Sequence, residues 1–584
     1  MHLSMTKGVL SHSAAFVFCL LLLAPFSSCQ HNAQAPLQAE PPNPSPGPVA
    51  AKRVAVIGAG SAGASTAYYL RHFTDFFSIP VNITVYERAS YVGGRSTTVN
   101  AFDDPAHPIE LGASIFVEVN KNLIQASKKF GLKLRDADSG QPKESLHSLG
   151  VWDGKEFAFL QTRQGIYWWN VFKLLYRYGW APLKTQNLMK VTVNKFLKLY
   201  KFPYFPFQSL SDVAMSTGLA EATWTSGAEY LKDNGIAEQF SREVIQASTR
   251  VNYGQNLALI HGLETMVCMA TDGAVAVEGG NWQIFQAMLN ASKATVKLNS
   301  PVTSIELSDD NTYTVSYQDP DVIYQDTDDD DDGDESFSAE ETFDHVVIAN
   351  PYQFSNISLS PPLKRPLDAP RYVDLHVTLF ASPHKLSPGY FNMPAGSSVP
   401  EVVLTTLPAD VKLGARIDGV GPAQFWSIST LEKVPAPGSS RQDGISGDPH
   451  YIYKVFSPKP LKANFISGIL GIDEARVLDS SNNDNDSNNE TGYSAEQRIA
   501  DIPMSHISWY YEKVWQSYPY LYPRVTFEDI KVAPNLWYTN GMESFISTME
   551  TSSLAGMNVA GLILSEWVSK FETKLKQYED GVGG

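Results

Sequence analysis

The 584-residue sequence is poor in cysteine and has no excess of positive charge. Its cysteines are Cys19, Cys29 and Cys268, and no Cys/His signature surrounds the last of these. We therefore expect Cys268 to be a buried apolar residue rather than a nucleophile. Acidic residues outnumber basic ones, the net charge is −17, and no basic patch stands out. The composition argues against nucleic acid as a partner.

The acidic charge is concentrated in one segment. Residues 326–341 contain ten acidic residues and no basic one, and without them the net charge is that of an ordinary globular protein. Calcium binding is the alternative role for this acidic segment, but no ligand spacing supports it. Residues 478–494 form a second polar segment, which has no apolar period. We predict that both are disordered surface insertions.

The sequence also lacks an apolar run long enough to cross a bilayer. The N-terminal run within residues 14–30 ends at Pro25, which suits the core of a signal peptide; an N-terminal membrane anchor is the alternative. We expect a signal peptide over residues 1–30 and a flexible, proline-rich leader over residues 31–50. Removal of the signal would leave one cysteine, and at most peripheral membrane contact is expected.

Glycosylation sequons support export from the cytosol. We expect N-glycans at Asn290, Asn356, Asn485 and Asn489, whereas Asn82 lies too close to a predicted strand for its use to be expected. The predicted destination is the secretory pathway, with a lysosome, a vacuole or the extracellular space as the end point.

A buried strand, a glycine turn and a helix are predicted directly after the leader. In the glycine motif, Gly58 permits the tight turn, Gly60 lets the backbone approach a pyrophosphate, and Gly63 lets the helix pack close to the strand. The free N–H groups near Ser61 and Ala62 would meet the phosphates. A βαβ unit without a ligand is the alternative.

The next predicted strand ends in Glu87 and Arg88. A carboxylate at this position accepts hydrogen bonds from ribose hydroxyls and would repel a 2′-phosphate, which argues against NADP. Gly93, Gly94 and Arg95 follow at once, and this turn would bring backbone amides and a guanidinium to the cofactor.

A second glycine segment, Gly112-Ala113-Ser114, lies where the chain could pass close to a flat ring. A ribose acid followed by Gly-Gly-Arg and Gly-Ala resembles the pattern of amine-oxidase-like flavoproteins. That resemblance implies FAD, with the backbone of Val302 at the adenine. It also implies a last helix that begins near Met549 and Glu550 and directs its positive end at the flavin.

The fold class expected is α/β. We predict a FAD-binding Rossmann-type domain of the glutathione-reductase or amine-oxidase-like kind, with a discontinuous substrate domain of mixed sheet and helices. The FAD-binding domain is assigned to residues 51–140, 265–365 and 530–584. The substrate-binding domain is assigned to residues 141–264 and 366–529.

Four segments carry a closer resemblance. RVNYGQ (250–255), AVEGGN (276–281), YVDLHVTLF (372–380) and the stretch at 538–560 are together similar to the prenylcysteine oxidase family. The resemblance implies that FAD, O2 and water convert S-farnesyl- or S-geranylgeranylcysteine to prenyl aldehyde, free cysteine and H2O2, in the degradation of prenylated proteins. No metal is expected.

The remaining predictions concern side chains near such a substrate. Tyr253 is the candidate substrate-facing residue, whereas His261 and His376 are interpreted as structural. The aromatic stretches at 166–180 and 202–207 line a substrate tunnel or pack in the core. The alternatives in function are another amine or polyisoprenoid oxidase, or a non-catalytic prenyl-binding protein of the GDP-dissociation-inhibitor type.

Overall fold

The central sheet forms around a buried first strand. The computed structural model describes residues 50–136, 139–162, 174–320, 338–411, 419–435, 449–472 and 497–568. Val54, Ala55 and Val56 are fully buried, and their strand pairs in parallel with a neighbour on each side. The sheet has six strands in the order β20 (Lys531–Ala533), β21 (Leu536–Tyr538), β13 (His345–Ile348), β1 (Lys52–Ile57), β2 (Val81–Tyr86) and β9 (Thr295–Lys297).

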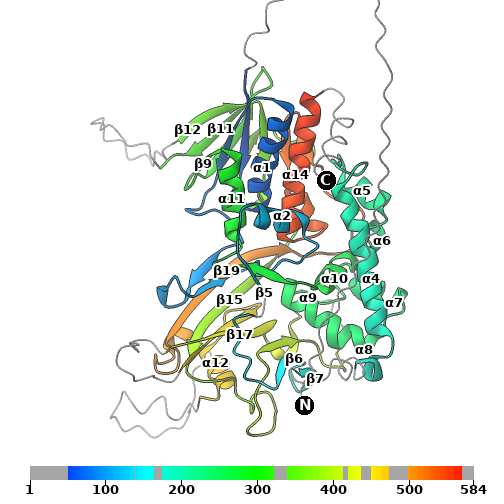
Figure 1. Ribbon diagram of the computed structural model, residues 1–584, viewed down its shortest axis with the longest axis vertical. Coiled ribbons are helices and arrows are strands. Elements are labelled where there is room, and N and C mark those ends of the chain that lie inside the picture. Colours follow the sequence, from blue (N-terminus) through cyan, green and yellow to red (C-terminus); the bar gives the residue numbers. More distant parts are fainter. Residues whose placement is uncertain are drawn as a thin grey trace, which may run out of the picture. The chain divides into compact units, whose positions relative to one another are not determined.

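Helices from both ends of the described chain pack together beside this sheet (Figure 1). Gly556 lies so close to the first helix that an added Cβ would be 2.2 Å from the carbonyl oxygen of Ala62. The helices are α1 (Ser61–Phe77), α2 (Lys121–Lys129), α11 (Trp282–Ser292) and α14 (Met549–Trp567).

A four-stranded sheet extends the same half of the molecule. Its order is β12 (Ser338–Phe343), β11 (Tyr313–Gln318), β10 (Val302–Leu307) and β14 (Ser358–Ser360). The expected disordered insertion at 326–341 is therefore wrong at its C-terminal end, because Ser338 to Glu341 pair with β11 in an antiparallel ladder. Exposure alternates along this strand, with Ser338, Glu340 and Thr342 exposed and Ala339, Glu341 and Phe343 less exposed, as the pleat of a strand requires.

The second half contains a seven-stranded sheet. It also includes α12 (Ala463–Leu470). Two short strand pairs are separate from the larger sheets: β3 (Thr98–Asn100) with β4 (Pro108–Glu110), and β5 (Leu134–Asp136) with β8 (Val275–Val277). The order of the large sheet is β19 (Trp509–Pro519), β15 (Tyr372–Ser382), β18 (His450–Ser457), β17 (Ser427–Val434), β16 (Val402–Thr405), β6 (His147–Trp152) and β7 (Phe157–Thr162).

A group of helices lies along one side of the molecule, on the right in Figure 1. They are α4 (Ala181–Phe196), α5 (Leu210–Thr217), α6 (Ala220–Thr223), α7 (Gly227–Asp233), α8 (Glu238–Phe240), α9 (Gln246–Tyr253) and α10 (Gly262–Met269). None of the helices in the described part of the chain is both long and apolar enough to cross a membrane.

The predicted α/β class with a Rossmann-type sheet and a mixed second sheet is confirmed. The predicted signal peptide, the leader to residue 49, the insertion at 478–494 and the sequons at Asn485 and Asn489 lie outside the described residues. Cys268 is buried, as expected.

Candidate functional site

The glycine turn between β1 and α1 has three glycines with three different surroundings. Gly58 has a φ of +108°, which a side chain would strain. A Cβ on Gly63 would be 1.8 Å from the carbonyl oxygen of Gly58, so this glycine permits the close packing of helix on strand. A Cβ on Gly60 would meet nothing nearer than 3.9 Å, because this residue faces a cavity.

The start of α1 offers free donors to that cavity. The helix begins after Gly60 with no side-chain cap and no acidic residue in its first turn. Ser61 and Ala62 line the cavity beside it. Unsatisfied N–H groups and the positive end of a helix are what a pyrophosphate requires.

Glu87 ties this turn to the end of β2. Its carboxylate accepts hydrogen bonds from the N–H groups of Ala59 (2.8 Å) and Ala89 (2.9 Å). Gly93 in turn donates from its N–H to the carbonyl oxygen of Ala59 at 3.0 Å. Contacts within the protein thus fix Glu87 and the Gly-Gly-Arg turn against the glycine loop.

One cavity of about 950 Å³ unites the predicted residues. Gly63 is the one predicted cofactor residue that does not line it, in agreement with its packing role. The predicted residues that line it are Gly58, Gly60, Ser61, Ala62, Glu87, Arg88, Gly93, Gly94, Arg95, Gly112, Ala113, Ser114, Tyr253, Val302, Met549 and Glu550.

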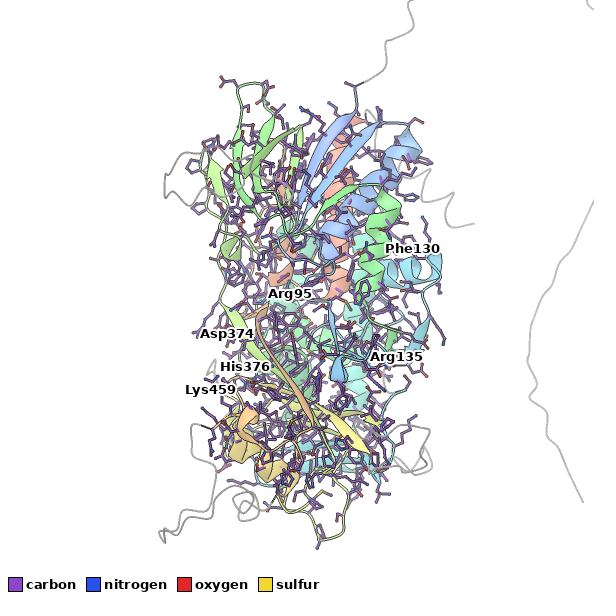
Figure 2. The ribbon with its side chains drawn as sticks, turned by 90° about the vertical axis from the view of Figure 1, so that its left-hand side faces the viewer. Arg95, Phe130, Arg135, Asp374, His376 and Lys459 are labelled. Atoms are coloured by element: carbon purple, nitrogen blue, oxygen red, sulfur yellow. The ribbon has the colours of Figure 1, made fainter. Side chains whose placement is uncertain are left out.

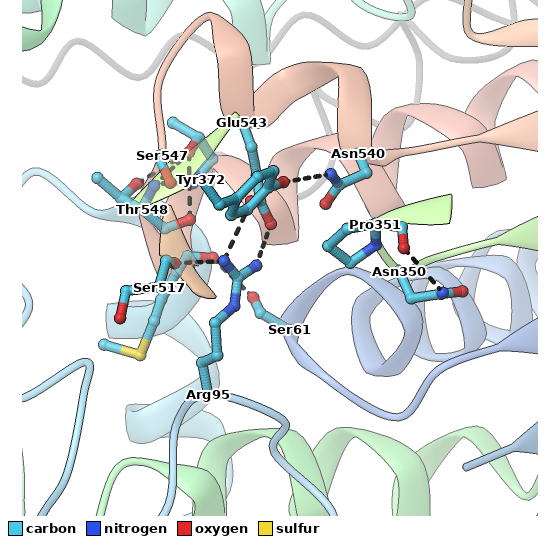
Figure 3. Close-up of polar contacts among 12 residues, drawn as sticks. Ser61, Arg95, Asn350, Pro351, Tyr372, Ser517, Asn540, Glu543, Ser547 and Thr548 are labelled. Atoms are coloured by element: carbon cyan, nitrogen blue, oxygen red, sulfur yellow. Dashed lines mark hydrogen bonds and ion pairs between the residues drawn. The ribbon is translucent and has the colours of Figure 1, made fainter. Parts of the chain in front are cut away.

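Arg95 lies between the two halves of the molecule and belongs to a polar network (Figures 2 and 3). Its guanidinium forms an ion pair with the buried Glu543 and donates to the carbonyl oxygen of Ser517. Tyr372 donates to the Glu543 carboxylate at 2.9 Å, and Asn540 donates to the Tyr372 hydroxyl at 3.0 Å. The guanidinium is therefore engaged by protein groups, and the Gly93-Gly94 backbone is what the turn presents to a cofactor.

The predicted start of the last helix is correct. Helix α14 begins at Met549 with Thr548 as its N-cap. The Glu550 carboxylate accepts hydrogen bonds from the N–H groups of Asn122 (2.8 Å) and Leu123 (3.0 Å) and from the Tyr200 hydroxyl (2.5 Å). Its side chain therefore caps α2, which leaves the backbone of the first turn of α14 for the cavity.

A buried ammonium group lies next to the Gly112–Ser114 segment. Lys454 Nζ donates to the carbonyl oxygen of Glu110 (2.5 Å) and to Ser114 Oγ (3.0 Å), and Lys454 lines the cavity. Burial lowers the pKa of Lys454 and raises the pKa of the neighbouring Glu110 carboxyl, which accepts a hydrogen bond from the N–H of Asn281. The ammonium group of Lys454, at the cavity wall, therefore loses its proton more readily than that of an exposed lysine.

Tyr253 lines the cavity in front of a buried carboxyl group. Its hydroxyl donates to the carbonyl oxygen of Ser547 at 3.1 Å, and its ring packs edge to face on Tyr518. Behind it lies Glu264. Its Oε2 accepts a hydrogen bond from the N–H of Ser547 at 3.3 Å, and its buried Oε1 has no hydrogen-bond partner among the described residues. Burial raises the pKa of Glu264 to about 8, so this side chain is a neutral carboxylic acid at physiological pH.

The residues present fit a polar dinucleotide at one end of the cavity. Buried oxygen atoms of Ser96, Asn350 and Ser517 line the cavity and have no partner within the described residues. Buried polar atoms are normally paired, so these three mark places for polar atoms of a ligand. The other end has apolar walls, with side chains such as Val193, Leu263, Met266, Val267 and Ile546.

The described residues of the aromatic stretches at 166–180 and 202–207 do not line a substrate tunnel. Phe205 and Phe207 are buried in the main core, whereas Tyr176, Trp180 and Phe202 are exposed. None of the described residues of these stretches lines the cavity. The interpretation of His261 and His376 as structural is consistent with the fold, because neither lines the cavity and His261 Nδ1 caps α10.

Comparisons with known proteins agree with this site. The family model for prenylcysteine lyase matches residues 161–577. The chain belongs to the prenylcysteine lyase family. A model for an NAD(P)-binding Rossmann-like domain matches residues 56–130, which contain the glycine turn.

The curated relatives of this prenylcysteine lyase family member match over most of their length. It is 28% identical to farnesylcysteine lyase from Arabidopsis thaliana over 532 residues, which cover 88% of this chain and 89% of the relative. It is 26% identical to prenylcysteine oxidase 1 from Homo sapiens with the same coverage. A solved putrescine oxidase variant shares the fold at a TM-score of 0.50 and 13% identity, covering 88% of this chain and 100% of that one.

Sequence reasoning missed several residues of the site. Tyr372, Asn540 and Glu543 lie within segments that the sequence analysis singled out, but no role was assigned to their side chains. Lys454 and Glu264 had no signal, because a lysine in an alternating strand and a glutamate in a helix are ordinarily exposed.

Proposed function

We propose that the protein is a FAD-dependent oxidase that cleaves the thioether of S-prenylcysteine. The thioether, O2 and water would give prenyl aldehyde, free cysteine and H2O2, a balance in which the thioether carbon is oxidised and O2 is reduced. The observation that carries the proposal is a single cavity with a dinucleotide-binding loop at one end and apolar walls at the other, in a chain of this family.

FAD is the cofactor that the site supports best. When bound, it would accept a hydride from the carbon attached to sulfur and pass the electrons to O2. Gly60 leaves room for a pyrophosphate, the Glu87 carboxylate would accept hydrogen bonds from the ribose hydroxyls, and the first turn of α14 would offer its N–H groups to the isoalloxazine. These roles rest on donors and space that the chain provides.

The remaining residues would bind and orient the substrate. The apolar side chains of α4 and α10 would hold the prenyl chain and exclude bulk water from it. Tyr253 stays the candidate for substrate contact, because its ring forms part of the wall at the start of α14. Cysteine release requires one proton at sulfur, and Lys454, a cavity-lining group whose pKa is lowered by burial, is the candidate donor.

The test is a spectrum and a turnover assay on the purified chain. We expect flavin absorption bands, release of FAD on denaturation, and equal amounts of peroxide and aldehyde after addition of farnesylcysteine in air. Flavin bands without turnover would reject the substrate and turn attention to amines and other isoprenoids. A preparation that binds the prenyl group but never contains flavin would reject the oxidase itself.

The compartment is part of the proposal. We propose that the chain enters the secretory pathway and acts in a lysosome or vacuole or after secretion, as its N-terminal apolar run and its sequons suggest. There it would act on prenylcysteine released when prenylated proteins are degraded.

A further inference from the structure

The stretch of sequence that contains α4 is positively charged in an otherwise acidic protein. Residues 157–211 contain eight basic residues and no acidic one, whereas the whole chain has a net charge of −17. The net charge of the whole chain does not show this local excess. The basic residues also form no dense run, because they are spaced by three to ten positions. They are Arg163, Lys173, Arg177, Lys184, Lys190, Lys195, Lys198 and Lys201.

The outer face of α4 combines these cations with exposed apolar side chains. Tyr176 and Trp180 precede the helix and are 86% and 69% exposed. Leu183 and Val191 are 46% and 44% exposed on the helix itself. At helical spacing they share one face with exposed lysines and asparagines: Lys184, Asn187, Lys190, Asn194 and Lys198.

The lysines on this face are not neutralised by neighbouring acids. Lys184 donates to the carbonyl oxygen of Gly235 and Lys195 to that of Gly218. Arg177 forms an ion pair with Glu243 at 2.8 Å, whereas within the described ranges no ion pair joins a lysine of α4 to a carboxylate. The positive charge therefore remains available to an external partner.

The inner face of the same helix belongs to the functional site. Thr192, Val193 and Phe196 line the cavity. The helix thus separates the surface just described from the apolar end of the cavity by its own diameter, about 10 Å.

We propose that the outer face of α4, with Tyr176 and Trp180, docks on an anionic phospholipid bilayer. Lysines attract the lipid phosphates, Trp and Tyr suit the headgroup region, and Leu183 and Val191 enter the boundary of the acyl chains. A helix in this position lies in the plane of the membrane surface. The proposal goes beyond the oxidase activity, and it would bring the apolar end of the cavity close to the phase in which a prenyl group dissolves.

The mixture of side chains favours a bilayer over other occupants. Nucleic acid would leave the exposed Leu183 and Val191 without an apolar partner, and the −17 net charge opposes its binding. A second copy of the chain would bring the lysines of this face against the same lysines across a two-fold interface.

The test is co-sedimentation of the full-length protein with vesicles. We expect binding to phosphatidylcholine vesicles that contain phosphatidylserine, weak binding to pure phosphatidylcholine, and loss of binding at high salt. Lys190→Glu with Lys198→Glu should lower the bound fraction at least about tenfold. Lys364→Glu with Lys459→Glu is the matched control, since both lysines are exposed and Lys459 lies on the side of the molecule that faces the viewer in Figure 2.

Folding and activity are read separately from membrane binding. The charge-reversed variants and Trp180→Ser should keep the wild-type unfolding temperature and flavin spectrum, because these side chains are exposed. Vesicle binding needs no turnover, so the result does not depend on the proposed substrate. Equal binding of wild type and the Lys190/Lys198 variant would overturn the proposal. So would dimerisation or binding of duplex DNA that this variant abolishes while vesicle binding persists.

Discussion

Glu264 shows how a single buried side chain can set the pH dependence of stability. Its pKa is raised by burial to about 8 from 4.5. The unfolded chain loses this proton above about pH 4.5 while the folded chain keeps it, so the contribution of Glu264 to folding falls as pH rises to about 8. The loss is at most about 5 kcal/mol at 1.36 kcal/mol per pKa unit.

Replacement of Glu264 by Gln should remove this dependence. We expect Glu264→Gln to unfold at a temperature closer to wild type at pH 5 than at pH 8, where the variant should be the more stable protein. Thermal unfolding of both proteins across that range is the measurement. A constant difference between the two curves at every pH would show that Glu264 is ionised in the folded state.

Two glycines of the first motif differ in their surroundings and allow a matched pair of substitutions: Gly60 faces the cavity, and Gly63 packs against the strand. Gly60→Ala should leave the unfolding temperature of the flavin-free protein unchanged and lower FAD affinity at least about tenfold, because its Cβ occupies the approach of the pyrophosphate. Gly63→Ala should destabilise the fold by about 2–4 kcal/mol, because its Cβ would contact Gly58 O. FAD titration and thermal unfolding separate the two. Normal FAD binding by Gly60→Ala would exclude this turn as the phosphate site.

Single residues could be assigned from the sequence where a motif requires one residue type at a fixed position. Gly58, Gly60 and Gly63 could be assigned from their spacing, because Gly58 needs a positive φ, Gly63 packs against the Gly58 carbonyl oxygen, and Gly60 leaves the cavity open. The ion pair of Arg95 with Glu543 could not be predicted, because it joins positions 448 apart in the chain. The sequence therefore indicated the guanidinium but not its partner.

At the scale of elements, the junction between α14 and α2 depends on one carboxylate. Glu550→Ala would leave two N–H groups of α2 and the Tyr200 hydroxyl without their acceptor. We expect a loss of about 2–3 kcal/mol, whereas Tyr200→Phe, which removes one of the three bonds, should cost about 1 kcal/mol. Chemical denaturation measures both. Equal losses would mean that water replaces the cap of α2.

Element boundaries were predicted with unequal success. The alternation of residue types over 372–382 predicts a strand, and the structure has it at Tyr372–Ser382, with apolar residues packed on both sides of the sheet. The apolar spacing over 188–200 predicts a helix, whereas the observed helix spans Ala181–Phe196, with Pro182 in its first turn, where proline is tolerated. A short polar segment, Ser338–Phe343, forms an edge strand that composition alone assigned to a loop.

At the scale of the whole molecule, the seven-stranded sheet is the part that no local pattern could predict. Strand β6 pairs in parallel with β16, and Leu149 lies opposite Val402. Pairings across some 250 residues are set by the total burial of the folded chain, and they leave no local periodicity. The sequence indicated a mixed second sheet but not its strand order.

Export of the whole chain has a direct test. In secreting eukaryotic cells, Asn290→Gln and Asn356→Gln should each remove one N-glycan, since both side chains are exposed. Asn82→Gln is the control; it lies in β2, and no change is expected. Gel mobility before and after glycosidase treatment is the measurement. Identical mobility of all three variants and wild type would argue against passage through the secretory pathway.

The packing of α1 against α14 has a consequence for biosynthesis. The Ser61 hydroxyl donates to the Met549 carbonyl oxygen, and Ser65 Oγ donates to Ser553 Oγ, so the first helix of the βαβ unit is completed by the last helix of the described chain. A ribosome must translate almost all of the message before this partner emerges. Until then the glycine loop lacks the packing partner that α14 provides. The cofactor is therefore expected to bind only after almost the whole chain has been synthesised. Premature stop codons anywhere upstream of Met549 should yield colourless protein.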